Sequence, residues 1–205
     1  MPTDPCTPAE RSRAASRRTQ ILQAASDCFH DHGFHGASIS LISKAAGMSA
    51  GHIYHYFENK EAIIAAIVER DLDRLLTLSA EMRAASDVLE ALIGRAAEGV
   101  IDNLDPRTAG LKVEIVAEAS RNPAVAKIVR AADRCCMSSL SETLRILRAN
   151  KGHSTDDATL QGMTEVLASM FEGLLLRAIR NPDLDRDRVV AIFQRVIRQL
   201  VTDPN

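Results

Sequence analysis

Residues 38–61 hold the side chains whose types and spacing indicate a chemical role, which is contact with nucleic acid. Ser38 and Ser49 suit the first position of a helix, where their hydroxyls accept hydrogen bonds from free N–H groups. Gly47 lies between them and suits the left-handed residue that ends a helix. The stretch predicts two helices joined by a very short turn, the arrangement whose second helix enters the DNA major groove. Closely joined helices also occur in proteins that never contact DNA, so the geometry alone leaves both readings open.

The start of the second helix is expected to face the edges of the bases. Ala50 and Gly51 lack hydrogen-bonding side chains, so they permit close approach and apolar contact with thymine methyl groups. His52 is the long polar side chain there, which makes it the candidate for sequence choice. One of the two tyrosines has an alternative role, packing inward beside Phe57. The remaining expected contacts, to phosphates or groove edges, come from Ser38, Ser40, Ser49, Tyr54, His55, Tyr56 and Lys60.

This stretch resembles the DNA-binding domain of the tetracycline-repressor (TetR) family. The matching residues begin upstream and include the motif Tyr-x-Tyr-Phe-x-x-Lys-Glu that ends at Glu61. Ser43 and His52 depart from the family pattern, which usually has alanine at the first position and a smaller residue at the second. His52 therefore leaves the base preference open. The other matching residues are Ile21, Ala25, Phe29, Gly33, Ile42, Ala46, Gly47, Met48 and Ser49.

The resemblance implies a ligand-responsive, DNA-binding transcriptional regulator. It implies a homodimer that represses from a pseudo-palindromic double-stranded DNA operator and is released by a small-molecule effector. Neither the effector nor the operator can be named from the sequence, and activation is an alternative to repression. A helical adaptor without DNA binding would explain the helices but not the motif. An enzyme with an unrecognised site is the remaining alternative.

Apolar periodicity and capping signals predict an all-α fold of about nine helices. Asp87, Asp105-Pro106 and Asn122-Pro123 mark helix starts in the second half of the chain. Residues 1–15, rich in Pro, Ser, Thr and Arg, predict a disordered arm, followed by a first helix from about Arg17 to Gly33. Residues 16–64 then form the three-helix DNA-binding domain, and residues 65–205 form a helical ligand-binding and dimerisation domain.

The composition agrees with an all-α fold. Hydrophobic residues make up 46% of the chain, aromatic residues only 3%, and Trp is absent, so the core consists mainly of aliphatic side chains. No apolar run approaches the roughly 18 residues of a membrane span, and no signal core is present, which predicts a cytoplasmic protein without a membrane partner. The net charge is −2, while residues 1–60 carry +1. This small asymmetry is compatible with one basic face.

Metal, cofactor and catalytic signals are missing from the sequence. The cysteines Cys6, Cys28, Cys135 and Cys136 have neither C-x-x-C spacing nor neighbouring histidines of the zinc type, so we expect no metal and no cofactor. No Gly-rich phosphate loop or nucleophile–base set is recognisable, so we expect no enzyme. For Cys135 and Cys136, inert packing is the simpler explanation and sensing of thiol-reactive compounds is the alternative.

Two carboxylates are the candidate effector contacts. The resemblance implies a ligand pocket in the body, and a helical wheel places Glu114 and Glu118 on or beside the apolar stripe of the helix that begins at Asp105. Two acids four residues apart repel each other unless something pairs them. A salt bridge with Arg95 or Arg121 is the simpler explanation. A pocket wall for a cationic or hydrogen-bonding ligand is the other.

The last two helices are the candidate dimer interface. The resemblance implies that they pair with their copies in a four-helix arrangement. The last helix is apolar on more than one face, which a helix covered on one side only would not need. The alternative is that these residues complete the core of a single chain. The candidate interface residues are Leu167, Met170, Phe171, Leu174, Leu175, Val189, Phe193, Val196, Ile197 and Leu200.

Overall fold

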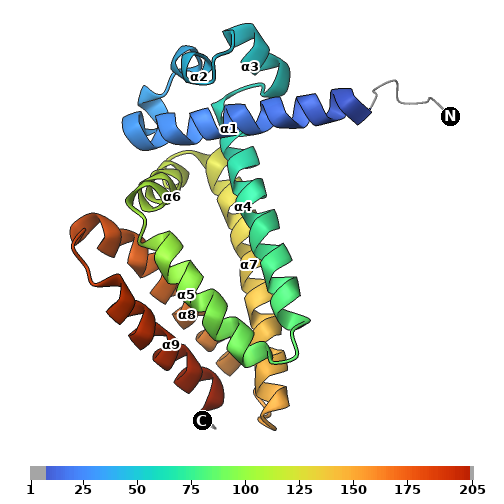
Figure 1. The fold of residues 1–205 in the computed structure, drawn as a ribbon, viewed down its shortest axis with the longest axis vertical. Helices are drawn as coiled ribbons and strands as arrows, with labels where there is room; N and C mark the ends of the chain where they lie inside the picture. The colour runs from blue at the N-terminus through green and yellow to red at the C-terminus, as the bar shows by residue number, and fades with distance from the viewer. Residues whose placement is uncertain (1–7, 204–205) are drawn as a thin grey trace, which may run out of the picture.

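The computed structural model describes residues 8–203, and within this range all regular structure is helical, which confirms the predicted all-α fold. The short helices lie at one end of the molecule, and most of the longer ones form the body below them (Figure 1). The nine helices of the described range are α1 Pro8–Gly36, α2 Ile39–Ala45, α3 Ala50–Tyr56, α4 Lys60–Arg83, α5 Val88–Asn103, α6 Pro106–Ala119, α7 Pro123–Asn150, α8 Asp157–Arg180 and α9 Arg186–Thr202.

The helix starts agree with the capping residues in the sequence. The side chains of Ser38, Ser49 and Asn59 each accept a hydrogen bond from the backbone N–H three residues further on. Asp87 and Asp105 do the same for α5 and α6. Asn122 caps α7, with proline at the first helical position as predicted. Local capping therefore determines where most of the helices begin.

The first helix differs from its prediction at both ends. It begins at Pro8, so residues 8–15 are helical and the predicted disordered arm is wrong there; residues 1–7 lie outside the described range. Proline is favoured in the first turn of a helix, and Ala14 and Ala15 are strong helix formers, which outweighs the Ser and Arg content. At the other end the helical backbone breaks at Gly33, as predicted, but one further helical turn continues to Gly36.

Two apolar clusters hold the fold together. The first joins α1 to α3 with the start of α4, and its fully buried members include Ile21, Phe29 and Ile53. The second lies in the body between α5, α7, α8 and α9. Ile115 of α6 and Val125 of α7 belong to the first cluster, so the helices below α1 help to bury it.

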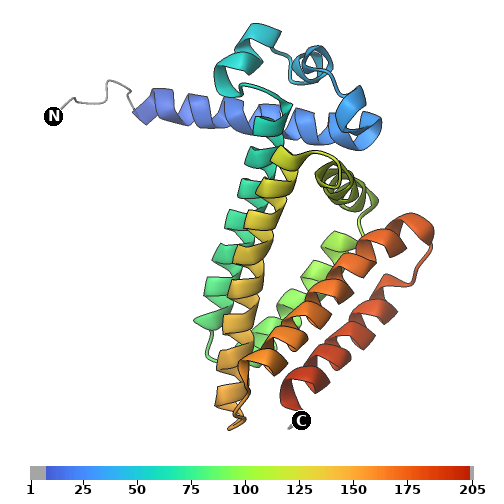
Figure 2. The same ribbon diagram turned by 180° about the vertical axis from the view of Figure 1, so that it is seen from behind.

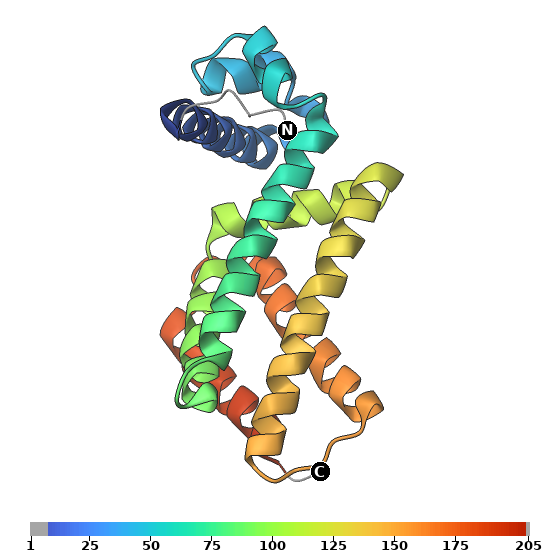
Figure 3. The same ribbon diagram turned by 90° about the vertical axis from the view of Figure 1, so that its right-hand side faces the viewer.

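The long helix α4 runs from the first cluster down the length of the body. It packs beside α7, as the view from behind shows (Figure 2). Figure 3 shows α6 lying across the top of the body, directly below α1. α4 and α6 are therefore the two elements through which the body supports the small helices. Within the described range, no helix is both long enough and apolar enough to cross a membrane.

Two glycines should respond differently to alanine. Gly33 and Gly47 both have positive φ, 69° and 63°. Nothing lies within 4 Å of a Cβ at Gly47, so Gly47→Ala should cost only the left-handed strain, about 1–2 kcal/mol. At Gly33 the ψ of 166° belongs to a region used almost only by glycine, and a Cβ would lie 3.2 Å from Glu114 Oε1. Gly33→Ala should therefore cost about 3 kcal/mol.

The control is Gly94→Ala, in the interior of α5, where the backbone is helical and the space is open. That change should stabilise the protein by up to about 1 kcal/mol. Chemical denaturation of the three variants measures their free energies of unfolding and so the order of their stabilities. A Gly33→Ala protein as stable as the Gly47→Ala protein would contradict the close contact with Glu114.

Candidate DNA-binding surface and its joint to the body

One side of α3 packs against the first apolar cluster, and the opposite side is exposed to solvent. Ile53 is fully buried and Phe57, directly after the helix, is 4% exposed, so these two side chains anchor it to the first cluster. Ala50, Gly51, His52, Tyr54 and His55 lie on its exposed side. α2 and α3 lie at the end of the molecule farthest from the body (Figure 1). The geometry thus presents the predicted reading residues to solvent on a helix whose orientation is fixed.

The side chains of α3 form a ring cluster. The His52 ring lies 5.4 Å from the Tyr56 ring, and the His55 ring lies 5.2 Å from it, measured between centroids. Tyr56 is half-buried and packs against the first cluster, whereas Tyr54 is 56% exposed. Tyr56 is therefore the tyrosine that packs inward, which leaves Tyr54 free to reach a partner. The two histidines are supported by the Tyr56 ring and remain exposed.

The serines before and within α2 have two kinds of surroundings. Ser38 and Ser40 are exposed at its start, where phosphates could approach the free N–H groups. Ser38 already accepts a hydrogen bond from the N–H of Leu41 at 3.1 Å. Ser43 is buried, and its hydroxyl donates to the carbonyl of Ser40 at 2.9 Å, as a back-bonding serine does. Serine in place of the usual alanine thus leaves no unpaired polar group there.

Lys60 is occupied within the chain. Its Nζ donates to the carbonyl oxygen of Phe34 at 2.6 Å and lies 4.4 Å from the centroid of the Phe34 ring. The ammonium therefore ties the start of α4 to the turn that follows Gly33. A phosphate contact by Lys60 stays a prediction, and it would have to compete with this internal bond.

The same turn is held from the other side by α6. Oε1 of Glu114 accepts a hydrogen bond from the backbone N–H of Phe34 at 2.7 Å. The backbone of Phe34 is thus fixed through its carbonyl by α4 and through its N–H by α6. A Cβ at Gly33 would crowd this carboxylate, which explains a glycine at that position.

We call the region where α4 and α6 contact the turn after Gly33 the joint between the DNA-binding helices and the body. The most deeply buried charge of this joint is Glu118, whose side chain is 1% exposed. Its Oε2 accepts from Nε of Arg121 at 2.8 Å and lies 3.1 Å from Nε2 of His35, while its Oε1 accepts from the amide of Asn122 at 3.1 Å. Burial raises the pKa of Glu118, but the hydrogen bonds from Asn122 and Arg121 outweigh it and hold the pKa below its ordinary value of 4.5. The carboxylate is thus ionised and fully paired.

Of the two explanations for Glu114 and Glu118, the salt bridge is present. Its arginine is Arg121; the other candidate, Arg95, pairs with Glu98 on its own helix. Contact of either carboxylate with an effector stays a prediction. Both side chains face the turn after Gly33, a role that the helical wheel could not reveal because it does not show which element packs against α6.

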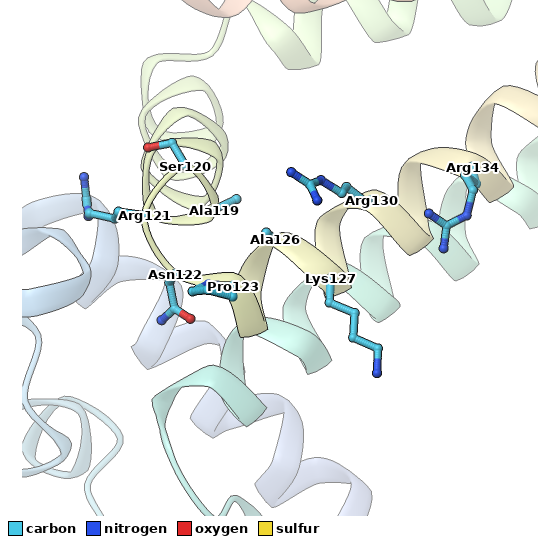
Figure 4. A pocket seen from close by; sticks show the side chains of 9 residues that line it. All are labelled: Ala119, Ser120, Arg121, Asn122, Pro123, Ala126, Lys127, Arg130 and Arg134. Carbon is cyan, nitrogen blue, oxygen red and sulfur yellow. The ribbon is translucent and has the colours of Figure 1, made fainter.

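A cleft of about 500 Å³ lies in the angle where α6 ends and α7 begins (Figure 4). It is lined by residues 119–123 and by Ala126, Lys127, Arg130 and Arg134 of α7. The sequence reasoning missed this site, although the positions of the three cations place them on one helical face. The spacing of these cations could have indicated the cleft from the sequence alone, because cations that follow one face of a helix suggest an anionic partner.

The ten candidate dimer residues divide into two groups. Leu167, Leu174, Phe193 and Ile197 are 7% exposed or less and belong to the core of the single chain. Val196 is 39% exposed, and the other five are partly buried against the same core. The outward faces of α8 and α9 carry further apolar side chains that the sequence reasoning did not name, and these are Val166, Leu176, Ile179 and Ile192.

The three cysteines in the described range differ in exposure. Cys28 is buried, Cys136 is half-buried and Cys135 is exposed, and all three are free thiols. Burial raises the pKa of Cys28 and of Cys136, which makes their thiolates less available. Cys6 lies outside the described range.

Comparison with known proteins agrees with this geometry. Residues 21–67 match the family described as "Bacterial regulatory proteins, tetR family", and residues 89–202 match "BetI-type transcriptional repressor, C-terminal". The chain belongs to the TetR family. It is therefore a helix-turn-helix, DNA-binding transcriptional regulator, and α2 and α3 are its helix-turn-helix.

TetR-family relatives align along almost the whole chain. The HTH-type transcriptional regulator UidR of Escherichia coli (strain K12) is 29% identical over 191 residues, covering 93% of this chain and 94% of that protein. The HTH-type transcriptional regulator BetI of Cronobacter sakazakii is 30% identical over 167 residues, 79% of each chain. The structure of Salmonella enterica GusR has a TM-score of 0.75 at 29% identity and covers 92% of this chain and 95% of its own.

Glu118→Gln tests the joint of this TetR-family chain. The change removes the charge but keeps the shape, so it should lower the free energy of unfolding by about 1 kcal/mol, a modest value because Arg121 is half-exposed and screened. The pKa of Glu118 is lower in the folded state, so its contribution is present above pH 4.5 and is lost as the pH falls further. Denaturation curves of the wild type and the variant should converge in acid.

The matched control is Glu142→Gln, an exposed carboxylate of α7 whose oxygen lies 3.9 Å from Arg145. It should change stability little at any pH. A Glu118→Gln protein that keeps full stability but loses effector affinity would instead assign Glu118 to the effector site.

Proposed function

We propose that the protein is a homodimeric repressor that binds a pseudo-palindromic operator through α3 and leaves it when a small molecule binds the helical body. The observation that carries this proposal is the exposed, polar face of α3 on a helix anchored by Ile53 and Phe57. Residues 16–64 serve as the DNA-binding domain, and residues 65–205 serve as the effector and dimerisation domain. A helical adaptor would not need an exposed reading face at the end of the molecule.

Within the reading face, the roles follow from side-chain chemistry. Ala50 and Gly51 allow the start of α3 to approach the bases closely, and nothing lies within 4 Å of a Cβ at Gly51. His52 reads a base edge, because its imidazole is exposed and is supported by the Tyr56 ring. Tyr54 and His55 contact phosphates along the edges of the groove. Ser38, Ser40 and Ser49 contact phosphates at the two helix starts.

The outward faces of α8 and α9 form the dimer interface in this proposal. Val166 and Leu176 share a face of α8 with Gly173, where a Cβ would meet nothing within 4 Å. Ile192 and Val196 lie on α9 beside an apolar groove of about 230 Å³. Small residues flanked by exposed aliphatic side chains suit close packing of another helix. A two-fold dimer places two copies of α3 about one helical turn of DNA apart, 34–36 Å or a simple multiple of it.

Effector and DNA act on one equilibrium between two conformers. An effector shifts that equilibrium only by its preference for one conformer, so it and the operator must weaken each other's binding reciprocally. α4 and α6 carry the change, since both hold the turn after Gly33. A mobility shift on DNA from upstream of the protein's own gene, with footprinting of the shifted complex, tests the proposal. Failure to bind any such fragment specifically would contradict it.

His52→Ala tests base reading. The change should weaken binding at particular base pairs by about 1–3 kcal/mol and relax the preference there, while other operator positions keep their ranking. Fluorescence anisotropy on a set of single-base operator variants measures this effect. The matched control is Tyr54→Phe, which removes a phosphate contact and should weaken all sequences by a similar factor. Uniform weakening by His52→Ala would make His52 a phosphate or folding residue.

Val196→Asp tests the interface. The side chain is 39% exposed in the single chain, so the aspartate should leave the fold intact but be buried without a partner in the dimer. The dimer dissociation constant should rise about a hundredfold, a penalty of close to 3 kcal/mol, and operator binding should weaken with it. Ile101→Asp is the matched control, since Ile101 is an exposed aliphatic residue of α5. Sedimentation velocity that finds both variants dimeric would exclude this face.

A further inference from the structure

The cleft between α6 and α7 is unusual for its charge. Four of its lining residues are cations: Arg121, which is paired with Glu118, and Lys127, Arg130 and Arg134 of α7. The three on α7 are spaced three and four residues apart, which places them on one face of the helix. In Figure 4, Arg130 reaches from α7 across the opening toward the end of α6. The cleft is thus a concave surface with one sign of charge along one side.

None of these three cations has an ion pair or hydrogen bond to another described residue. Like charges at this spacing repel one another, so the stripe costs stability unless an anion neutralises it. Asp133 lies three residues after Arg130 and is therefore its neighbour on the helix surface, but it forms no salt bridge with Arg130 or Arg134 among the described residues. Several other cations of the described chain are paired, among them Arg107 with Asp27, Arg145 with Asp157 and Arg198 with Glu90.

The rim of the cleft is connected to the DNA-binding helices. Arg121 and Asn122 line the cleft, and both donate hydrogen bonds to the buried carboxylate of Glu118. The amide of Asn122 also donates to Glu61, at the start of α4, at 3.3 Å. Glu118 in turn lies against His35 in the last turn of α1. A displacement of residues 120–122 would therefore disturb the joint through the side chains of Arg121 and Asn122.

We propose that this cleft binds the effector through an oxyanion group, such as a carboxylate or a phosphate, held by Arg130 and Arg134. The bound anion moves the turn at residues 120–122 and so weakens the contacts of Glu118 with the DNA-binding helices. This inference rests on the proposed function, because it names the chemical class and the location of the effector. It also explains why three cations on one face of α7 line a cleft without partners.

The experiment compares two fluorescent probes that differ by one charge. 8-Anilinonaphthalene-1-sulfonate carries a sulfonate oxyanion, and N-phenyl-1-naphthylamine is its neutral counterpart. Each is titrated into the full-length wild type, the double variant Arg130→Gln/Arg134→Gln and a control, Arg145→Gln/Lys151→Gln. The control removes two exposed cations from the far end of α7 and so matches the change in net charge. Operator affinity is measured with and without each probe.

The sulfonate should bind the wild type and the control equally and the cleft variant at least about tenfold more weakly, since two charge-assisted contacts are lost. The neutral probe should not distinguish the three proteins. The sulfonate should also weaken operator binding by the wild type and the control. Equal sulfonate binding by all three proteins would overturn the site. Cleft-dependent binding that leaves operator affinity unchanged would overturn its role as the effector site.

Failure of the two proposals can be told apart. If the wild type binds no operator, the proposed repressor function fails, while the probe titration still judges the cleft. If the wild type binds its operator but the sulfonate binds the wild type and the cleft variant equally, the repressor function stands and the oxyanion site is wrong.

Discussion

The short turn after Gly33 is the constraint on which the arrangement of this protein depends. The backbone of Phe34 is bound from both sides, by Lys60 of α4 through its carbonyl and by Glu114 of α6 through its N–H. Each bond carries a charge, which makes it stronger than a neutral hydrogen bond. The turn belongs to α1, and α1 carries the core on which α2 and α3 rest. The direction in which the reading helix points is therefore set by two helices of the body.

In the proposed mechanism, this arrangement favours a joint that switches between two arrangements over a joint that bends gradually. Ile115 of α6 and Val125 of α7 are buried in the same cluster as the reading helices, so apolar packing reinforces the polar bonds. Closely packed interfaces of this kind do not deform gradually, because small shifts lose contacts on one side before they gain them on the other. A movement of α6 relative to α4 must break a bond to Phe34 or carry the turn with it. Either outcome changes the direction of α3.

Most of the fold could be predicted from the sequence, whereas the joint and the cleft could not. Helix starts depend on local capping, so Ser49 and Asn122 could be recognised from their neighbours alone. The motif in residues 38–61 likewise identified the helix-turn-helix, because its residues are contiguous. The partner of Glu118 at His35 lies 83 positions away, and which element packs against α6 is a tertiary property. For the same reason, apolar periodicity on α8 and α9 did not separate the face that covers the core from the face that remains exposed.

The two carboxylates of α6 show how a residue can be singled out from the sequence while its structural surroundings remain unknown. A buried charge is costly, so Glu118 requires partners, and its deep burial within a regulatory protein made effector contact a reasonable hypothesis. Its contacts place it between the cleft and the DNA-binding helices, where Arg121 and Asn122 supply its hydrogen bonds from the rim of the cleft. Withdrawing either partner would leave a buried carboxylate undersatisfied, and such a group gains by rearranging toward water. Sensitivity of the joint to the cleft therefore follows from the desolvation of one carboxylate, without any contact between Glu118 and the effector.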